Sequence, residues 1–173
     1  MTTVGILIVS DRAFTAAQAT QGRRSRASRE QYEDKSGPAL REAAERRGWN
    51  VTAQKIVPDS KPAIQKAIRS LAKTGCEVIL TTGGTGVTRR DVTPDAISAI
   101  ARCELPGFGE VMRAESLKIT PHAILSRTSA FVVGKSLVVC LPGSPKGTVE
   151  CLEFVAAAIP HAVDLLQEKP AKH

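Results

Sequence analysis

The feature that most constrains the fold is a nearly continuous apolar run at residues 3–10, TVGILIVS. A strand with one face in water alternates apolar and polar residues, so this run predicts a strand buried on both faces. Sheets bury both faces when helices cover them on each side, which is typical of parallel α/β folds. The run therefore favours a sheet enclosed between two helical layers.

The next part of the chain supports this interpretation. Apolar periodicity predicts helices at 36–48 and 60–75, and strands at 51–57 and 77–82. Strands that alternate with helices in this way predict a mostly parallel sheet with helices on both faces. We therefore expect an α/β three-layer sandwich.

The C-terminal part predicts a late β-hairpin and a final helix. Residues 131–133 and 137–141 are apolar and flank Gly134-Lys135-Ser136, a turn sequence. A last helix is expected at 146–166, interrupted at Pro160. Since no internal repeat or second apolar core is visible, we expect residues 1–173 to form a single domain.

Composition excludes several functional classes. The chain has 42% hydrophobic and 24% charged residues, as in soluble globular proteins. Six aromatic residues give little material for a surface that stacks nucleic-acid bases. No apolar stretch is long enough to span a membrane, and no signal peptide is recognisable. We therefore expect a cytoplasmic protein without a membrane partner, and the composition disfavours a nucleic-acid partner.

The four cysteines form no C-x-x-C pair, and without a secretory signal they are expected to be reduced thiols. Cys140 lies in an apolar run and Cys151 on a helix, so both are predicted to be core residues. The net charge of +7 favours acidic or phosphorylated ligands, although it also fits a solvated surface.

Residues 14–31 differ from the rest of the chain. The segment FTAAQATQGRRSRASREQ is polar, carries four arginines and lacks apolar periodicity, so it predicts a mobile basic insertion loop. Such a loop fits three roles: a lid over a phosphorylated substrate, an arm that contacts RNA, or a solvated insertion. The sequence leaves the three open.

The strongest functional signal is the run EVILTTGGTGVTRRDVTPD at 77–95. A short strand ends at Gly83-Gly84-Thr85-Gly86, where glycines permit positive φ and let amide groups approach an anion. Arg89 and Arg90 add cations, and Asp91 adds a carboxylate suited to a hard metal ion. Thr93 is predicted as the N-cap of the next helix. The alternative is a glycine-rich turn with solvated charges.

Two common nucleotide motifs do not account for this loop. A Walker A loop has Lys and then Ser or Thr after its last glycine, whereas Gly86 precedes Val87-Thr88. The third glycine of a dinucleotide fingerprint would fall on Arg89. A phosphate site here must belong to another class.

Further polar segments are expected at the same edge, because ligands bind beyond the carboxyl ends of parallel strands. Ser10-Asp11-Arg12 follows the first strand, Asp59 the second, and 142–146 (PGSPK) the late strand. Together they suit phosphoryl or nucleotidyl transfer, which needs amides, cations and carboxylates that hold Mg²⁺.

Each of these residues also has a structural interpretation. Asp11 is able to cap a turn, Asp59 to stabilise a helix start, and Lys146 to face solvent. Lys146 is nevertheless expected in the first turn of a helix, where the dipole disfavours a cation, and this hints at an anionic ligand.

Seven segments, in order along most of the chain, resemble the bacterial molybdopterin adenylyltransferases. They are SDRA (10–13), YEDKSGPAL (32–40), IVPD (56–59), TTGGTG-x-x-RRDVTPDA (81–96), LPGFGEVMR (105–113), AILSR (123–127) and LPGSPK (141–146). The resemblance implies a compact α/β domain that assembles as a homotrimer. It also implies transfer of AMP from Mg-ATP to the terminal phosphate of molybdopterin, with release of pyrophosphate. The product would pass to a molybdenum-insertion enzyme.

The resemblance places the two essential acidic positions on Asp59 and Asp91, which we assign as catalytic residues and Mg²⁺ ligands. The expected substrate- and nucleotide-binding residues are Ser10, Asp11, Arg12, Thr82, Gly83, Gly84, Thr85, Gly86, Arg90, Pro142, Gly143, Ser144 and Lys146.

Residues 14–31 depart from the family pattern, which has only a few residues there. RRDVTP is intact at 89–94, which favours the enzyme over a paralogue group in which this segment is altered. The alternatives are a non-catalytic molybdopterin-binding or delivery protein, and an RNA-binding protein that uses the arginine-rich loop.

Overall fold

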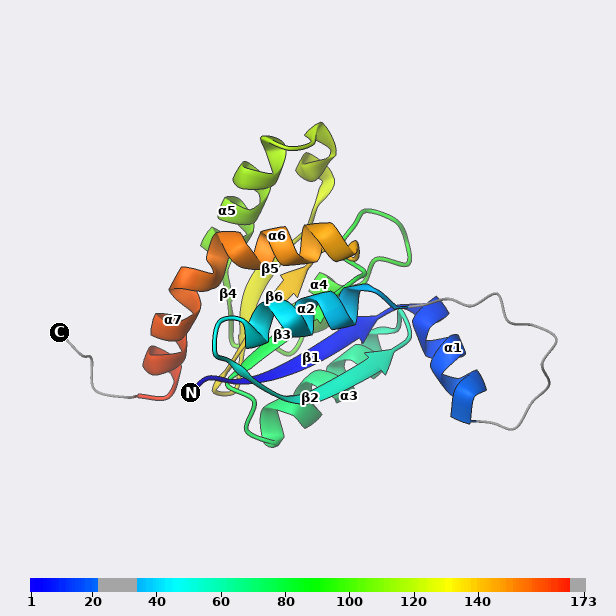
Figure 1. Ribbon diagram of the computed structural model, residues 1–173, viewed down its shortest axis with the longest axis horizontal. Helices are drawn as coiled ribbons and strands as arrows, with labels where there is room; N and C mark the ends of the chain where they lie inside the picture. The colour runs from blue at the N-terminus through cyan, green and yellow to red at the C-terminus, as the bar shows by residue number, and fades with distance from the viewer. Residues whose placement is uncertain (22–33, 169–173) are drawn as a thin grey trace.

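The computed structural model describes residues 1–21 and 34–168. Its six strands form one sheet in the order β2-β1-β3-β6-β5-β4 (Figure 1). They are β1 (Thr3–Val9), β2 (Asn50–Val57), β3 (Val78–Thr82), β4 (Cys103–Leu105), β5 (Ser129–Val133) and β6 (Ser136–Leu141). The first four strands in that order pair in parallel, whereas β5 pairs antiparallel with both β6 and β4. The predicted mostly parallel sheet and late hairpin are confirmed.

Helices cover both faces of the sheet. They are α1 (Asp11–Gln21), α2 (Ser36–Glu45), α3 (Lys61–Lys73), α4 (Thr93–Ser98), α5 (Pro106–Leu117), α6 (Pro145–Val155) and α7 (Ile159–Leu166), with 3₁₀ turns η1 (Pro121–Leu125) and η2 (Ala156–Ala158). One core cluster joins the sheet to α2, α5, α6 and α7, and the other joins it to α3 and α4. Figure 1 shows α2 and α6 on the near side of the sheet and α3 on the far side. The predicted three-layer sandwich is confirmed.

The first strand is central to this arrangement. β1 lies between β2 and β3, and its residues from Val4 to Val9 are all buried. Alternate side chains enter opposite clusters, Ile6 and Ile8 on one face and Leu7 and Val9 on the other. A strand with two buried faces has no polar positions, which explains its continuous apolar run.

The prediction of a loop at 14–31 is wrong for residues 14–21, which belong to α1. Ala13 is buried in the core, and the N–H of Phe14 donates to the carbonyl of Ser10 at 2.9 Å. Alanines give almost no hydrophobic periodicity, yet alanine has the highest helix propensity of any residue. Residues 22–33 lie outside the described residues, so the three roles suggested for the basic loop stay open.

The sequence predicted no element at 103–125, where the structure has β4, α5 and η1. Helix α5 and the η1 turn project from the body at the top of Figure 1, whereas β4 is the edge strand of the sheet. Only Gly109 and Met112 of α5 are buried, so the helix lacks the apolar stripe that would have predicted it.

The interruption predicted near Pro160 is confirmed, because α6 ends at Val155 and α7 begins at Ile159. Proline lacks the N–H that a continuous helix requires. Within the described part of the chain, no helix is both long and apolar enough to cross a membrane.

Candidate active site

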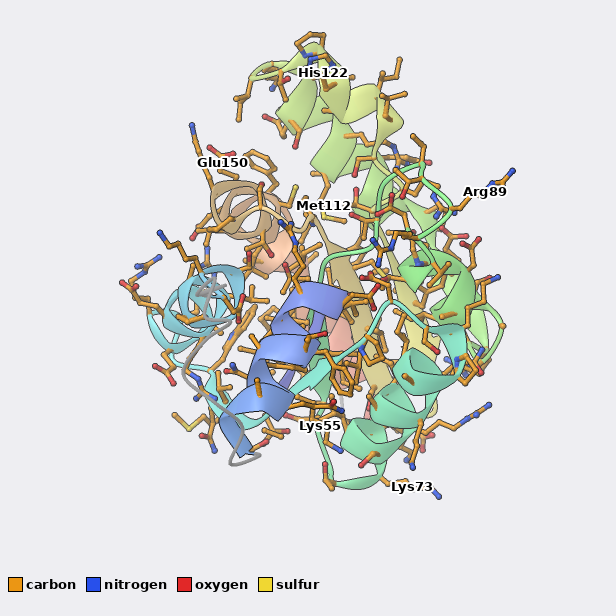
Figure 2. The ribbon with its side chains drawn as sticks, turned by 90° about the vertical axis from the view of Figure 1, so that its right-hand side faces the viewer. Lys55, Lys73, Arg89, Met112, His122 and Glu150 are labelled. Carbon is orange, nitrogen blue, oxygen red and sulfur yellow. The ribbon has the colours of Figure 1, made fainter. Side chains whose placement is uncertain are left out.

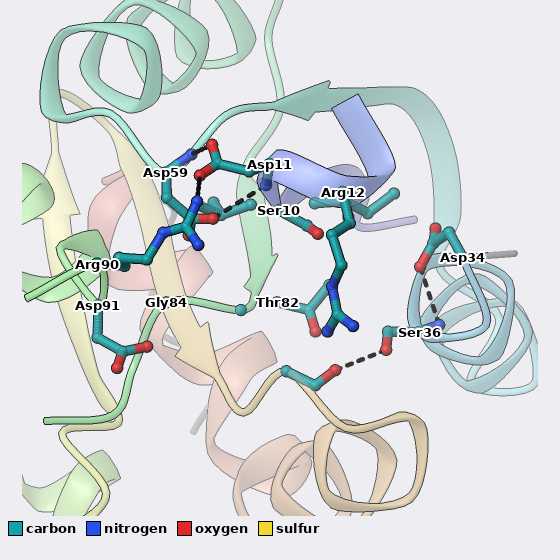
Figure 3. A pocket seen from close by; sticks show the side chains of 14 residues that line it. Ser10, Asp11, Arg12, Asp34, Ser36, Asp59, Thr82, Gly84, Arg90 and Asp91 are labelled. Carbon is teal, nitrogen blue, oxygen red and sulfur yellow. Dashed lines mark hydrogen bonds and ion pairs between the residues drawn. The ribbon is translucent and has the colours of Figure 1, made fainter. Parts of the chain in front are cut away.

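A pocket of about 350 Å³ lies where the carboxyl ends of the parallel strands meet (Figure 3). Predicted residues that line it are Ser10, Asp11, Arg12, Asp59, Thr82, Gly83, Gly84, Arg90, Asp91 and Gly143. They come from four loops, each of which follows a different parallel strand. The prediction that these segments converge at one sheet edge is confirmed.

The remaining predicted residues lie outside the pocket lining. They are Thr85, Gly86, Pro142, Ser144 and Lys146. Arg89, which the sequence offered as a second cation of the loop, points outward into solvent in Figure 2.

Asp34 and Ser36 also line the pocket, and the sequence predictions did not include them. Asp34 Oδ1 accepts from the N–H groups of Ser36 and Gly37 at 3.1 and 3.2 Å, so it fixes the start of α2. Ser36 Oγ donates to the carbonyl of Gly143 at 2.8 Å. The signal was present in the segment DKSG, a carboxylate two residues before a helix start.

A reciprocal clasp joins the ends of β1 and β2. The N–H of Asp11 donates to Asp59 Oδ2 at 3.0 Å, and the N–H of Asp59 donates to Asp11 Oδ1 at 2.9 Å. Arg90 forms an ion pair with Asp11 Oδ2, which links the loop after β3 to this clasp. In Figure 3 the guanidinium groups of Arg12 and Arg90 lie on opposite sides of the pocket, and that of Arg90 points toward Asp11. The two arginines thus place cations among the four carboxylates that line the pocket, those of Asp11, Asp34, Asp59 and Asp91.

The clasp separates the pKa values of its two carboxyl groups. The hydrogen bond from the Asp59 N–H and the bond and charge of Arg90 hold the pKa of Asp11 below its usual value, against a smaller effect of burial. Burial raises the pKa of Asp59, and the charges of Asp11 and Asp91 add to the shift. The Asp11 N–H and Arg90 offset part of it. Asp59 is therefore the carboxylate that most needs a further cation.

Two glycines give the loop after β3 its shape. Gly83 has φ of 101° and Gly84 has φ of 65°. A Cβ on Gly83 would lie well inside 3.0 Å of the Val9 carbonyl oxygen. Only glycine combines this backbone conformation with so close an approach to the neighbouring strand. The predicted positive φ is confirmed for Gly83 and Gly84 but not for Gly86, and the approach of an anion to their amides stays a prediction.

The prediction of Thr93 as an N-cap is wrong. Helix α4 begins at Thr93, and Val92 occupies the cap position. Thr93 Oγ1 instead donates to the carbonyl of Gly83 at 2.8 Å, and its N–H donates to the carbonyl of Gly84 at 3.0 Å. A buried carbonyl needs a donor, so the hydroxyl serves the glycine loop rather than its own helix.

Asp91 both faces the pocket and organises its own turn. Its Oδ2 accepts from the N–H and the hydroxyl of Thr88 at 2.9 and 2.6 Å. Burial alone would raise the pKa of Asp91, but hydrogen bonds from Thr88 and Gly86 and the charge of Arg127 hold it below its usual value. Asp91 is thus an ionised carboxylate in a fixed orientation.

Comparison with known proteins now decides the family. The family model described as "Probable molybdopterin binding domain" matches residues 5–161. The chain belongs to this family. The molybdopterin adenylyltransferase of Helicobacter pylori J99 is 46% identical over 166 residues, which cover 94% of this chain and 86% of that relative. The protein of the same name from Escherichia coli K12 is 39% identical and is covered to 85%.

Solved structures agree with this assignment. The molybdopterin biosynthesis enzyme MoaB of Thermus thermophilus has a TM-score of 0.84 and 41% identity, over 99% of this chain and all of that one. The molybdopterin biosynthesis Mog protein of Mycobacterium ulcerans has a TM-score of 0.80 and 31% identity, over 96% and 99% of the two chains. The family and the fold therefore agree.

The carboxylates of this family member fit a metal ion that is shared with substrate. Within residues 1–21 and 34–168, no group of three His, Cys, Asp or Glu residues could hold a metal ion alone. Mg²⁺, however, usually takes one or two carboxylates and completes its shell with water and phosphate oxygens. Asp59 and Asp91 line one pocket and are close enough for the charge of Asp91 to raise the pKa of Asp59. These two residues fit such a site.

The loop after β6 has a different construction. Ser144 is the N-cap of α6, and its Oγ accepts from the N–H of Gly147 at 3.1 Å. Thr82 Oγ1 donates to the carbonyl of Pro142 at 2.7 Å. Lys146 is exposed and pairs with Glu150, one turn further along α6, at 3.7 Å. This ion pair gives the unfavourably placed lysine a partner within its own helix.

The two cysteines expected in the core are there. Burial raises the pKa of the Cys140 thiol to about 12 and also raises the pKa of Cys151. Thiols with raised pKa values are poor nucleophiles, so neither residue suits covalent catalysis.

Proposed function

We propose that this chain is a molybdopterin adenylyltransferase that transfers AMP from ATP to the terminal phosphate of molybdopterin and releases pyrophosphate. The observation that carries the proposal is the pocket itself, where a glycine loop, two arginines and four aspartates from five segments meet. Relatives of that name, 39 and 46% identical over nearly the whole chain, support the choice of reaction.

The reaction needs no protein nucleophile. A terminal phosphate oxygen of molybdopterin forms the new bond to the α-phosphorus of ATP, while the bond from that phosphorus to the bridging oxygen breaks. The electron pair leaves with pyrophosphate. A phosphate is already ionised at neutral pH, so no general base is required for the attack.

The chain positions the reactants and neutralises their charge. Gly83 and Gly84 line the pocket, and because the N–H of Gly83 already donates to the carbonyl of Leu141 at 3.3 Å, we assign phosphate contact to the N–H of Gly84. Arg12 and Arg90 face the same pocket, and their guanidinium groups suit phosphate oxygens. Asp59 and Asp91 would hold Mg²⁺, which would add positive charge beside the substrate phosphates.

Four further parts of the proposal rest on the family resemblance and stay predictions. They are the homotrimer, the use of Mg²⁺, the binding roles of individual pocket residues, and delivery of the product to a molybdenum-insertion enzyme. A cytoplasmic location is part of the same proposal, and the free cysteines of the described chain support it.

The test is single-turnover adenylyl transfer with purified protein, molybdopterin and Mg-ATP. Asp59→Asn and Asp91→Asn should each lower the transfer rate about 100- to 1000-fold, the scale for loss of one preorganised transition-state contact. The double variant should lose less than the product of the two effects, because residues that act together are not additive. Circular dichroism and molybdopterin binding should change little.

Glu42→Gln is the matched control, because Glu42 is an exposed carboxylate on α2 whose partner is Arg46. It should transfer AMP at the wild-type rate. Near wild-type transfer by both aspartate variants would contradict the catalytic assignment. If the wild type binds molybdopterin tightly but transfers nothing, the chain is a binding or delivery protein, the second candidate that its family membership supports.

A further inference from the structure

Arg127 lies outside the pocket lining, yet its side chain contacts the loop that carries Arg90 and Asp91. Its Nε donates to the carbonyl of Gly86 at 2.8 Å, and its Nη2 donates to the carbonyl of Asp91. Its Nη1 lies 3.2 and 3.0 Å from the two carboxylate oxygens of Asp95 on α4. Every nitrogen of the guanidinium group is thus engaged.

The backbone of Arg127 extends the same contact. Its N–H donates to the carbonyl of Thr85 at 2.9 Å. One residue therefore binds both ends of the segment 85–91, although it lies more than thirty positions away along the chain. Such a set of contacts fixes the separation between the two ends of the loop.

The loop has few other attachments. Val87 is 64% exposed, and residues 88–90 are exposed as well, so no apolar side chain anchors this segment in the core. The bonds between Thr88 and Asp91 lie within the loop and do not tie it to the body. In the described chain, Thr93 and the carbonyl of Leu141 hold the Gly83–Gly84 end, and the ion pair from Arg90 to Asp11 is a further long-range attachment.

We propose that Arg127 is a positioning residue, which holds the loop after β3 so that Arg90 and Asp91 face the pocket. This inference rests on the proposed adenylyl transfer and adds a residue to its machinery. Arginine suits the role because its planar fork reaches three acceptors at once, whereas lysine offers a single point charge. Asp95 sets the orientation of the fork by accepting from Nη1.

The α5–η1 unit supports Arg127 from the other side. Arg113 Nη1 donates to the carbonyl of Ser126 at 3.4 Å and to that of Thr128 at 2.8 Å, the residues on either side of Arg127. A Cβ on Gly109 would lie well inside 3.0 Å of the Thr128 carbonyl, so α5 approaches this segment at a glycine. The projecting unit thereby connects to the pocket through Arg127.

The test compares Arg127→Ala, Arg127→Lys and the control Arg47→Ala. Arg47, which follows the C-terminal end of α2, is a matched arginine. It also donates to a backbone carbonyl, that of Ala43, and pairs with a carboxylate, that of Glu153 on α6. Arg127→Ala should lower single-turnover transfer about 100-fold, the effect of a small misplacement of catalytic groups. Arg127→Lys should stay below a tenth of the wild-type transfer rate, and Arg47→Ala should transfer AMP at the wild-type rate.

Amide hydrogen exchange of residues 85–92 gives a readout that does not depend on activity. Arg127→Ala should speed exchange there and Arg47→Ala should not. If Arg127→Ala fails to fold, Asp95→Ala removes only the orienting carboxylate, and it should show a weaker form of both effects. Unchanged exchange and transfer in the Arg127 variants, or full rescue by lysine, would overturn the inference. If the wild type transfers no AMP but Arg127→Ala still speeds exchange of residues 85–92, the proposed reaction is refuted and the positioning role stands.

Discussion

The two glycine-containing loops that meet at the pocket are built in different ways. The loop from β6 to α6 spans only residues 142–144. Ser144 caps the helix that follows, and the hydroxyls of Ser36 and Thr82 donate to the carbonyls of Gly143 and Pro142. The loop from β3 to α4 spans residues 83–92, and distant groups hold it, above all Arg127. Both loops use tertiary contacts, but only the short loop also supplies a side-chain cap to the helix that follows it.

Their glycines also differ. Gly83 and Gly84 have positive φ, whereas Gly143 does not. A Cβ on Gly83 would collide with backbone, but one on Gly143 would lie 3.3 Å from the Cα of Gly83, a separation that a small shift can relieve. The long loop therefore depends on glycine more strictly than the short one.

The largest expected effect separates these two glycines. Gly83→Ala should lower the free energy of unfolding by about 3 kcal/mol, because it adds backbone strain and an overpacked contact with Val9. Gly143→Ala should lower it by less than about 1 kcal/mol. Urea unfolding of both variants measures the difference. Equal losses would mean that the two loops tolerate a side chain alike.

A second effect compares the two hydroxyl groups that fasten the loops. Thr93→Val leaves the Gly83 carbonyl without its side-chain donor and should lower the free energy of unfolding by about 2 kcal/mol. Ser144→Ala removes an exposed helix cap and should lower it by about 1 kcal/mol. Ser144→Asp keeps a capping oxygen and serves as the control. Thermal unfolding measures both losses. If Ser144→Ala loses more stability than Thr93→Val, the short loop is the more dependent on its side chain.

The smallest effect is a pH dependence of opposite sign at two carboxylates. The raised pKa of Asp59 means that folding disfavours its ionised form, so its contribution to stability is present at acid pH and is lost as pH rises through its folded pKa. The lowered pKa of Asp91 means that its contribution is present at neutral pH and is lost as pH falls through its folded pKa.

Substitution by asparagine should therefore act in opposite directions. As pH rises from about 3 to about 7, Asp59→Asn should become more stable relative to the wild type, and Asp91→Asn should become less stable. Free energies of unfolding from urea titrations at several pH values measure both trends. The same trend in both variants would show that the clasp and the Thr88–Asp91 turn do not shift the pKa values of Asp59 and Asp91 in opposite directions.

Sequence patterns predicted the sheet and most of the pocket because both follow from local rules. Continuous apolar runs marked the buried strands, and the carboxyl-end rule brought Asp11, Asp59, Asp91 and Gly143 to one edge. Helix α1 was missed because alanines carry little periodicity, and α5 because it buries only Gly109 and Met112. Asp34 and Ser36 were missed because their segment was interpreted only as a helix start.

By itself, the sequence determined which strands are buried, where glycine is needed and which loops share a sheet edge. These properties depend on side-chain type and on spacing along the chain, and both can be read from the order of residues. Only the tertiary structure decided that Asp11 and Asp59 clasp each other and that Arg127 holds the loop of Arg90 and Asp91. Those hydrogen bonds join residues far apart in the chain, and their geometry exists only once the sheet and helices have packed.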